Sequence, residues 1–511
     1  MTVLPSLPRP VSTAGVPLGD VVPGAPLIVA TGVSLDSRRL VPGDLYAALP
    51  GASTHGARFA ALAVSGGAVA VLTDPAGAAE LDGLGVPVIQ VPDPRSEAAR
   101  VAAAVYGHPA DRLAMFGITG TTGKTSTTCL VEAGLSAAGM VTGTIGTLGF
   151  RLAGEPLVSD RSTITTPEAP DLQALLAVML ERGATAVAME VSSHALDQHR
   201  VDGITFDVAA FTNLGQDHLD YHGDLESYFE AKSRLFLGGQ TREAVISIDD
   251  PWGRRLVTMI EADGQARVHT TGSDPAADYR VVSCALDAAG RSRVRLATPA
   301  REVGFELGML GSFNVTNAVT AVAMLDQGSV DLDAALSGLA GAVVPGRMER
   351  VPLAGDAPNV VVDFAHTPEA VAAALSALPA GRRIAVLGCG GDRDAGKRGP
   401  MGAAAARFAD LVVVTDDNPR GEDPAAIRQA ILAGARAAAS RSGAEVIDGG
   451  DRRSAIRTAL RAARPGEWIA ILGKGHEQGQ EIGGVVSPFS DVVVACEEWQ
   501  AANGGGEQWI S

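Results

Sequence analysis

The chain has 511 residues, which is too many for one hydrophobic core and indicates about three domains of ordinary size. Apolar residues make up 46% of it and aromatic residues 4%, which favours an Ala- and Val-rich α/β protein and argues against disorder. The formal net charge of −17 argues against binding nucleic acid or an acidic membrane surface through overall charge.

The first section runs to His108 and contains GVSLDSRRLVPGDLYAALPG, GARFAALAVSGGAVAVL and GVPVIQVPD. These stretches predict strand, turn, strand, helix and strand, a small α/β unit. The preceding MTVLPSLPRPVSTAGVPLGD is interrupted by prolines, unlike the apolar core of a signal peptide, and is expected to be a flexible leader.

The second section alternates strands such as LAMFGI, TAVAMEV and FDVAAFTNL with helices up to residue 344. In the third, NVVVDFA, RIAVLGCG, DLVVVTD and WIAILGKG end in polar loops, and helical segments follow most of them. Apolar runs of this kind are typical of parallel strands covered on both faces. We therefore expect three α/β domains at 1–108, 109–344 and 345–511.

Two features of the sequence bear on the cellular location of the protein. The uncharged run from Ala133 to Phe150 is half Gly, Ser and Thr, so it predicts the end of a helix, a turn and a strand rather than a membrane span. The cysteines form no CxxC pair, which argues against disulfides and zinc and favours a reducing cytoplasm. They are Cys129, Cys284, Cys389 and Cys496.

The most specific motif is GITGTTGKTSTTCLVEAGL, which connects an apolar strand to a helix. Its glycines let backbone N–H groups converge on phosphate oxygens, Lys124 can reach the terminal phosphates, and Thr125 can bind Mg²⁺. The motif predicts a nucleoside triphosphate site, and a chance Gly-Lys-Thr turn is the alternative. Only two residues separate its glycines and Ile118 replaces the usual first glycine, so the loop belongs to a particular subfamily.

Acids and histidines gather after two later strands. Glu190 ends an apolar strand, where an acid beside a phosphate loop can hold magnesium, although a strand-end glutamate alone is more often a helix cap or surface charge. The next loop favours a metal site, although helix capping explains one or two of its residues. That loop contains Asn213, Asp217, His218, Asp220 and His222. Lys232 follows in a helix and, taken alone, is expected to be exposed.

The stretch DDNPR places Arg420 just after a buried strand of the third section. Ligands of doubly wound sheets bind at the carboxyl ends of strands, where this loop meets DFAHTP, GCGGDRDAGKR and LGKGHE. Pro419 biases Asn418 toward an extended conformation, and a guanidinium matches a carboxylate bidentately. We therefore predict a carboxylate clamp. The alternative is a turn in which Arg420 pairs with Glu422 or Asp423.

A resemblance sharpens these expectations. The motifs GTTGKT, EVSSHALDQHR, TNLGQDHLDYHG with AKSRLF, GSFNVTNAVTA, GRMERV, DFAHTPEA, GCGGDRDAGKR, DDNPR and GKGHE resemble the successive signatures of the Mur ligases, in order, from Val33 to Asp491. They are most similar to the type that adds the third residue to the peptidoglycan precursor UDP-N-acetylmuramoyl-L-alanyl-D-glutamate. The resemblance implies a uridine-nucleotide domain, a central ATPase domain and a Rossmann-like amino-acid domain.

The resemblance also implies a mechanism, in which ATP phosphorylates the D-glutamyl γ-carboxylate and the amine of the amino acid attacks the acyl phosphate. Lys124, Glu190, His218 and Lys232 would be catalytic. Lys232 would carry a carbamate that, with His218, holds a second Mg²⁺, and Thr125 and Glu190 would be further metal ligands. The expected ATP contacts are Gly120, Thr121, Thr122, Gly123, Lys124, Thr125, Asn317, Arg347 and Asp363.

The substrates follow in the same way. Leu35 and Ser37 of LDSR would contact the uridine end. The muramoyl-dipeptide would be held by Thr165, Thr166, Ser192, Gln198 and Arg200. The residues that match diaminopimelate-binding positions are Arg393, Asp417, Asn418, Pro419, Arg420, Gly473 and Glu477. DDNPR is associated with diaminopimelate-adding members, whereas lysine-adding members lack the arginine.

Three alternatives stay open at this point: a lysine-adding ligase, an ATP-dependent switch or scaffold that no longer ligates, and a folylpolyglutamate synthetase, which lacks LDSR and DDNPR. The sequence does not distinguish meso- from LL-diaminopimelate, and a monomer is the default expectation.

Overall fold

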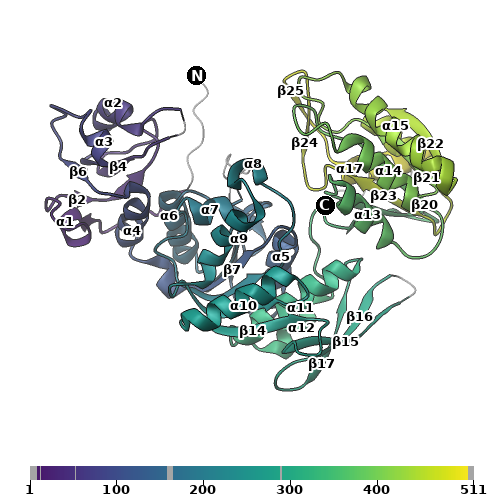
Figure 1. The fold of residues 1–511 in the computed structure, drawn as a ribbon, viewed down its shortest axis with the longest axis horizontal. Helices are drawn as coiled ribbons and strands as arrows, with labels where there is room; N and C mark the ends of the chain where they lie inside the picture. Colours follow the sequence, from purple (N-terminus) through teal and green to yellow (C-terminus); the bar gives the residue numbers. More distant parts are fainter. Residues whose placement is uncertain (1–7, 12, 52, 158–164, 288–289, 504–511) are drawn as a thin grey trace. The chain divides into compact units, whose positions relative to one another are not determined.

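The computed structural model describes residues 8–11, 13–51, 53–157, 165–287 and 290–503 (Figure 1). Its contacts divide the chain into two compact units. The first unit comprises Met1–Cys284, Arg293–Glu306 and Thr316–Ala342, and the second comprises Ala285–Ser292, Leu307–Val315 and Val343–Ser511. Within the described ranges, no helix combines the length and apolar character needed to cross a bilayer.

A small parallel sheet of order β3-β4-β5-β6 begins the first unit. Its strands are β3 (Gly32–Ser34), β4 (Asp44–Ala48), β5 (Ala70–Thr73) and β6 (Val88–Gln90). The helix α4 (Pro94–Val105) starts at Asp93, whose side chain accepts hydrogen bonds from the backbone N–H groups of Arg95 and Ser96. Ala174 and Ala177 of α6 (Ala169–Glu181) complete this core, so the sheet packs directly on the next part of the chain.

The shorter elements of this region are β1 (Val16–Pro17), β2 (Val29–Ala30), α1 (Leu18–Val21), α2 (Ala60–Ser65) and α3 (Pro75–Ala78).

The larger sheet of the first unit has the order β10-β9-β8-β11-β7-β12-β13-β14-β15-β16-β17. Its central strands are parallel and almost entirely buried, which suits the apolar sequences of β7 and β11. They are β8 (Thr142–Gly146), β11 (Ala186–Glu190), β7 (Ala114–Thr119) and β12 (Phe206–Phe211). The outer strands are β9 (Gly149–Leu152), β10 (Glu155–Pro156), β13 (Thr241–Ser247), β14 (Arg267–Gly272), β15 (Tyr279–Leu286), β16 (Ser292–Ala297) and β17 (Glu302–Leu307).

Helices α6, α7, α9 and α10 share an apolar core with this sheet, whereas α12 packs on α5 and α8 on α9 (Figure 1). The helices of this region are α5 (Lys124–Ala137), α6, α7 (Ser193–Asp197), α8 (Leu219–His222), α9 (Leu225–Ser233), α10 (Pro251–Asp263), α11 (Ser312–Gln327) and α12 (Leu332–Leu339). The run from Ala133 to Phe150 is the end of α5, a turn, β8 and the start of β9, as the sequence predicts.

The second unit contains a sheet of order β18-β19-β23-β20-β21-β22, parallel except for β18. The strands are β18 (Glu349–Arg350), β19 (Asn359–Asp363), β20 (Arg383–Leu387), β21 (Leu411–Thr415), β22 (Glu445–Gly450) and β23 (Trp468–Leu472). The helices are α13 (Pro368–Ser376), α14 (Arg398–Phe408), α15 (Pro424–Ser442), α16 (Arg452–Ala462) and α17 (Asp491–Ala502).

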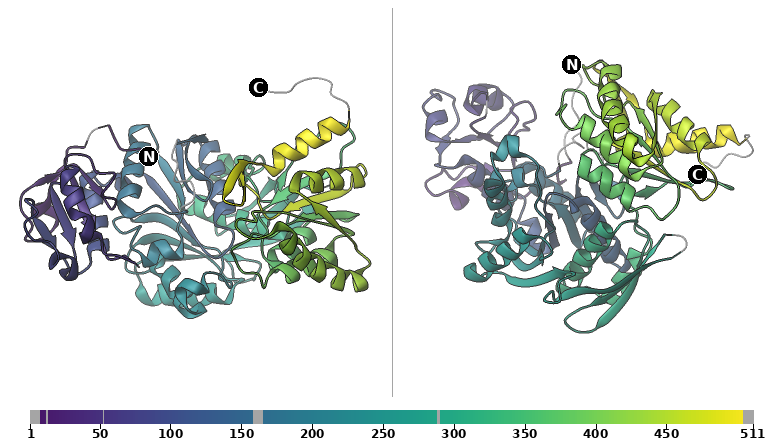
Figure 2. Two further views of the ribbon diagram at one scale, coloured as in Figure 1. Left: turned by 90° about the horizontal axis from the view of Figure 1, so that it is seen from above. Right: turned by 45° about the vertical axis from the view of Figure 1, so that its right-hand side comes forward.

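Separate apolar cores lie on the two faces of this sheet. The helices α13, α14 and α15 contribute to one core, and α16 and α17 to the other (Figure 2). The four site loops expected from the sequence follow β19, β20, β21 and β23, which are adjacent and parallel. They therefore leave the sheet at one edge. A hairpin of β24 (Gly479–Ile482) and β25 (Val485–Pro488) follows β23.

Candidate functional site

The glycine-rich loop lies between β7 and α5, as the motif predicts. Gly120 and Gly123 have φ angles of 147° and 87°, and a Cβ at Gly120 would lie 1.9 Å from Thr212 Oγ1. The end of β12 holds the loop: Thr212 Oγ1 donates to the Thr122 carbonyl at 2.6 Å, and Asn213 Oδ1 accepts from the Thr122 N–H at 3.0 Å. The backbone is thereby fixed in a curve that suits a phosphate chain.

Two lysines meet at this loop. Lys124 Nζ donates to the Gly120 carbonyl at 2.7 Å, and Lys232 Nζ donates to the same oxygen at 2.9 Å. Lys232 is only 1% exposed, so the expectation of an exposed helix lysine from residue type alone is wrong. Burial, together with the charge of Lys124, lowers the pKa of Lys232 well below its ordinary value. The Lys232 amine is therefore biased toward its neutral form.

Glu190 lies at the end of β11, directly beside β7, and is 2% exposed. Its carboxylate accepts from the Thr147 N–H at 2.8 Å and from Thr147 Oγ1 at 3.1 Å. Glu190 and Thr125 line one small cavity between the start of α5 and the end of β8. A carboxylate and a hydroxyl are hard oxygen ligands, so this donor pair fits Mg²⁺.

The loop after β12 forms an aromatic cluster. The His218 ring lies 4.9 Å from that of His194 and 6.2 Å from that of Tyr228, and Lys232 Nζ lies 4.4 Å from the Tyr228 ring centre. His222 Nε2 contacts Ser193 Oγ at 2.9 Å. Asn213, which the sequence places among metal-ligand candidates, uses its amide on the phosphate loop instead. No group of three or more His, Cys, Asp or Glu side chains suited to a metal occurs in the described ranges.

The residues expected at the muramoyl-dipeptide form one hydrogen-bonded network. Thr166 Oγ1 donates to the Glu190 carbonyl at 2.9 Å and accepts from the Ser192 N–H at 3.1 Å. Arg200 Nη1 donates to the Thr166 carbonyl at 2.9 Å, and its Nη2 donates to Gln198 Oε1 at 2.7 Å. The fifth member, Thr165, lies with its Oγ1 3.5 Å from Thr147 Oγ1. This network adjoins Glu190 and thus the phosphate loop.

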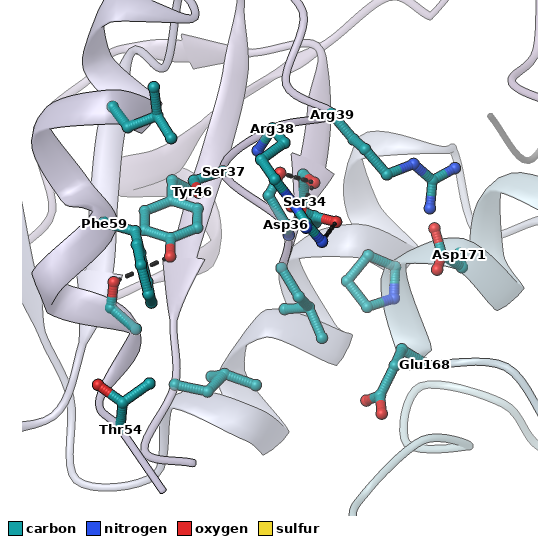
Figure 3. Close-up of a pocket in the computed structure, with 15 residues that line it drawn as sticks. Ser34, Asp36, Ser37, Arg38, Arg39, Tyr46, Thr54, Phe59, Glu168 and Asp171 are labelled. Carbon is teal, nitrogen blue, oxygen red and sulfur yellow. Dashed lines mark hydrogen bonds and ion pairs between the residues drawn. The ribbon is translucent and has the colours of Figure 1, made fainter. Parts of the chain in front are cut away.

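A cavity of about 580 Å³ opens beside the small N-terminal sheet (Figure 3). Leu35 and Ser37 both line it, together with Phe59 and residues at the start of α6. Figure 3 shows Arg39 and Asp171 pointing toward one another on one side of the cavity. An aromatic face and several hydrogen-bonding groups suit a nucleoside.

The three remaining ATP candidates lie in different units. A Cβ at Gly123 would lie 2.5 Å from Asn317 Oδ1, so Asn317 adjoins the phosphate loop in the first unit. In the second unit, the Asp363 carboxylate accepts from the backbone N–H of Met348 at 2.7 Å and of Ala365 at 2.9 Å. Burial raises the pKa of Asp363, and the nearby Arg347 opposes that rise. Arg347 lies over the Phe364 ring at 4.5 Å.

The loops that follow β19, β20, β21 and β23, called the amino-acid loops below, contain the residues predicted to bind the amino acid, and a buried lysine connects several of them. Lys474 is 0% exposed, and its Nζ donates to Asn418 Oδ1 at 3.1 Å, Glu477 Oε2 at 2.8 Å and the Gly479 carbonyl at 2.6 Å. Asn418 Nδ2 also donates to Glu477 Oε2 at 2.8 Å. Burial alone would raise the pKa of Glu477, but these partners lower it. The Glu477 carboxylate is therefore ionised and fixed.

Asp417 lies beneath this network. Gly473 has a φ of 113°, and a Cβ there would lie 2.4 Å from Asp417 Oδ2, so a side chain at Gly473 would displace the acid. Burial raises the pKa of Asp417, and the charges of Arg452 and Lys474 oppose it. Arg452 is itself 1% exposed and forms a bidentate pair with Asp491, both at 2.7 Å.

Arg420 follows Pro419 in a left-handed conformation, with φ of 50°. Its Nη1 donates to the Gly391 carbonyl at 2.8 Å, and its Nε lies 3.6 Å from Glu481 Oε2. The alternative pairing with Glu422 or Asp423 is wrong: Glu422 binds Arg398, and the Asp423 side chain caps α15. A Cβ at Gly390 would lie 2.9 Å from Arg420 Nη1 and 4.0 Å from Arg393 Cγ, so the exposed Arg393 is nearby.

Sequence reasoning missed three residues of this region: Lys474, Arg452 and Glu481. The GKGHE motif contains Lys474, but a lysine in a polar loop gives no sign that it is buried. Glu481 lies in the hairpin β24–β25. The sequence does indicate this hairpin, because GQEIGGVV has a Gly-Gly pair between strand-forming residues.

Family models match three consecutive parts of the chain. The model described as "Mur ligase family, catalytic domain" matches residues 29–115, "Mur ligase middle domain" matches 118–325, and "Mur ligase, glutamate ligase domain" matches 346–502.

Individual relatives extend over nearly the whole chain. A UDP-N-acetylmuramoyl-L-alanyl-D-glutamate–2,6-diaminopimelate ligase of Streptomyces coelicolor is 46% identical over 98% of this chain and 99% of its own length. A ligase of the same name from Corynebacterium glutamicum is 46% identical over 94% of this chain and 93% of its own.

Among solved structures, one with that ligase name is 32% identical, with a TM-score of 0.71, covering 96% of this chain and 100% of its own. A Mycobacterium tuberculosis folylpolyglutamate synthase complexed with ADP and AMPPCP is 22% identical, with a TM-score of 0.60, covering 80% of this chain and 95% of its own; it shares the fold. The three matched models and the near full-length relatives agree with the phosphate loop and the amino-acid loops described above, and the chain belongs to the Mur ligase family.

Proposed function

We propose that this protein is an ATP-dependent ligase that joins 2,6-diaminopimelate to the D-glutamyl γ-carboxylate of UDP-N-acetylmuramoyl-L-alanyl-D-glutamate, in peptidoglycan synthesis. The names of the relatives support the nucleotide dipeptide and diaminopimelate as substrates. The choice of diaminopimelate as the amino acid rests on Arg420. The Gly391 carbonyl and the Glu481 carboxylate hold its guanidinium in place, and its Nη2 makes no hydrogen bond to any described residue. A fixed guanidinium with one open nitrogen suits a second carboxylate, which diaminopimelate has and lysine lacks.

The reaction has two stages. A γ-carboxylate oxygen attacks the terminal phosphorus of ATP, the bond to ADP breaks, and an acyl phosphate forms. The amine nitrogen of diaminopimelate then attacks the acyl carbon, loses a proton, and phosphate leaves as the amide forms. The phosphate loop would hold ATP through its backbone N–H groups and Lys124. Thr165, Thr166, Ser192, Gln198 and Arg200 would orient the muramoyl-dipeptide beside it.

The proposed ATP contacts also include Asn317, Arg347 and Asp363. The uridine end of the nucleotide substrate would contact Leu35 and Ser37. The amino-acid contacts we propose are Arg393, Asp417, Asn418, Pro419, Arg420, Gly473 and Glu477. On this assignment the domains divide at residues 108 and 344, and the enzyme works as a cytoplasmic monomer.

Magnesium would be held by Thr125, Glu190, His218 and Lys232 as its carbamate; when bound, it neutralises charge on the transferring phosphoryl group. Carbamate formation needs a neutral amine, because the nitrogen lone pair bonds to carbon dioxide and a proton is released. The lowered pKa of Lys232 supplies that form. A carbamate would also replace the neutral amine by an anion, whose oxygens can bind metal and whose charge is opposite to that of the nearby Lys124.

The test is the identity of the product. The purified protein is incubated with the dipeptide nucleotide, ATP and Mg²⁺ in separate reactions with meso-diaminopimelate, LL-diaminopimelate and L-lysine. The mass of the nucleotide product is then measured by mass spectrometry. We expect a product that gains one diaminopimelate less water, with one isomer preferred. A lysine adduct alone would make this a lysine-adding ligase, and no adduct would favour a switch or scaffold.

A further inference from the structure

The segment before β1 is attached to the folded chain, although the sequence predicts a flexible leader there. The Val11 N–H donates to Glu181 Oε2 at 3.1 Å, and Thr13 Oγ1 donates to the Thr31 carbonyl at 2.7 Å. Glu181 is the last residue of α6, and Thr31 directly precedes β3. Residues 8–11 and 13, called the N-terminal arm below, therefore contact both α6 and the small N-terminal sheet.

The strongest attachment of the N-terminal arm is an ion pair. Arg9 donates to both oxygens of the Asp44 carboxylate, from Nη1 at 2.8 Å and from Nη2 at 2.9 Å, and the Asp44 side chain is 0% exposed. Burial alone would lower the pKa of Arg9, but hydrogen bonding to Asp44 and the charges of Asp44 and Asp171 raise it. A Cβ at Gly32 would lie 2.2 Å from Asp44 Oδ1 and 3.0 Å from Arg9 Nη1, so the pair packs against β3. Without Arg9, a buried carboxylate would lose this cation, which is costly.

The Arg9–Asp44 pair lies at the start of two strands that continue into one wall of the nucleoside cavity. In the parallel pairing of β3 with β4, Gly32 is opposite Asp44 and Ser34 is opposite Tyr46. Ser34 and Tyr46 both line the cavity. The ion pair therefore holds these strands two residues before they reach the cavity.

The other wall of the cavity belongs to α6. Glu168 and Asp171, at the start of this helix, line the cavity on the side opposite Tyr46 and Phe59 (Figure 3). The N-terminal arm contacts the other end of the same helix, at Glu181. Because a helix of 13 residues moves as one body, a contact at its last residue also restrains its first turn. The N-terminal arm thus connects the two walls of the cavity.

We propose that Arg9 is a positioning residue for the nucleotide substrate: with its contacts to Asp44 and α6, the N-terminal arm fixes the small sheet relative to α6 and so sets the width of the cavity. This inference rests on the proposed function, in which the cavity takes the uridine end, and extends it to residues that do not touch the substrate. When the arm is released, the binding-competent arrangement becomes less populated, and the apparent affinity falls by the same factor.

The experiment measures kcat and the KM values for the dipeptide nucleotide, ATP and the preferred diaminopimelate isomer by phosphate release. We expect Arg9→Ala to raise KM for the nucleotide about tenfold, as when about one molecule in ten is binding-competent. The value of kcat and the other two KM values should change less than about twofold. Arg9→Lys keeps the charge but loses the bidentate geometry, so its nucleotide KM should be intermediate. The matched control is Arg100→Ala, which removes an exposed ion pair with Glu97 on α4 and should alter no kinetic constant.

A second substitution tests the connection to α6. Glu181→Ala removes the acceptor of the Val11 N–H and leaves Arg9 and Asp44 in place, so KM for the nucleotide should rise about two- to threefold. Because both substitutions release the same arm, the double variant with Arg9→Ala should show less than the product of the two single effects.

An unchanged KM for the nucleotide in Arg9→Ala would overturn the proposal. An equal rise of all three KM values, or a fall in kcat alone, would overturn it as well, because Arg9 would then act on the fold as a whole. Melting temperatures verify that each variant is folded. If Arg9→Ala does not fold, Arg9→Lys and Glu181→Ala decide, and an unchanged nucleotide KM in both would refute the role of the arm. Failure of the proposed function appears separately, in the wild type, as the absence of any amide product.

Discussion

The phosphate loop and the amino-acid loops both lie at the carboxyl ends of parallel strands, but they differ in the partners of their positively charged residue types. At the phosphate loop, Lys124 and Lys232 donate to one neutral carbonyl, that of Gly120. At the amino-acid loops, cations bind carboxylates: Lys474 binds Glu477, and Arg420 lies beside Glu481. The difference matches the proposed ligands, because a polyphosphate brings the negative charge that the first site needs, whereas a zwitterion requires a site that is already balanced.

The largest expected effect tests the phosphate-loop side of this comparison. Lys232→Ala should lower turnover about 1000-fold or more, the upper scale for losing one preorganised charge-stabilising group. The measurement is phosphate release, with Glu230→Ala on the exposed face of α9 as the control. Partial rescue by a short carboxylic acid would support the carbamate. Retained activity in the variant would remove Lys232 from the mechanism.

A second substitution asks whether the two sites can be separated. Arg420→Asn removes the clamp but leaves the phosphate loop intact. We expect kcat/KM for diaminopimelate to fall about 100-fold, since truncating one partner of a charge pair costs roughly 2–5 kcal/mol. KM for ATP should change less than about twofold. Unchanged amino-acid kinetics would refute the clamp.

The third prediction concerns the balance of charge itself. Lys474→Met leaves Glu477 and Asn418 without their shared donor, so KM for diaminopimelate should rise about tenfold. The hairpin loses its bond to the Gly479 carbonyl, and its amides should exchange with solvent faster. Hydrogen exchange and kinetics measure the two effects. Slower exchange, or a change confined to KM for ATP, would contradict this role.

The smallest effect is on stability. Burial and the nearby Arg347 lower the pKa of His476 to about 4, below its ordinary value of 6.5. The unfolded chain therefore binds this proton first as the pH falls, and stability is lost between about pH 6.5 and 4. Over that range, the unfolding free energy should fall by about 2 kcal/mol more in the wild type than in His476→Asn. Equal pH profiles from urea unfolding would contradict this.

Much of this comparison could be predicted from the sequence. The phosphate loop has a local signature, because Gly120, Gly123 and Lys124 act through backbone conformation and spacing. The unbroken apolar strands predicted parallel sheets, and hence that polar loops such as DDNPR share one edge.

Long-range contacts could not be predicted. Lys232 is separated by 112 residues from the Gly120 carbonyl that it contacts, and residue type alone favours an exposed position for it. Arg420 has two acids close by in sequence, yet both are engaged elsewhere, and the hairpin supplies Glu481 from 61 residues away. Local sequence does not encode which of several acids reaches a given cation, since tertiary packing decides it.

The most direct test of the whole account is the rate of phosphate release from ATP with the dipeptide nucleotide present, as a function of amino acid. We predict release that depends on one diaminopimelate isomer, exceeds that with L-lysine, and is lost without an amino acid. Release only with lysine would contradict the account of Arg420, and release independent of any amino acid would contradict the ligase.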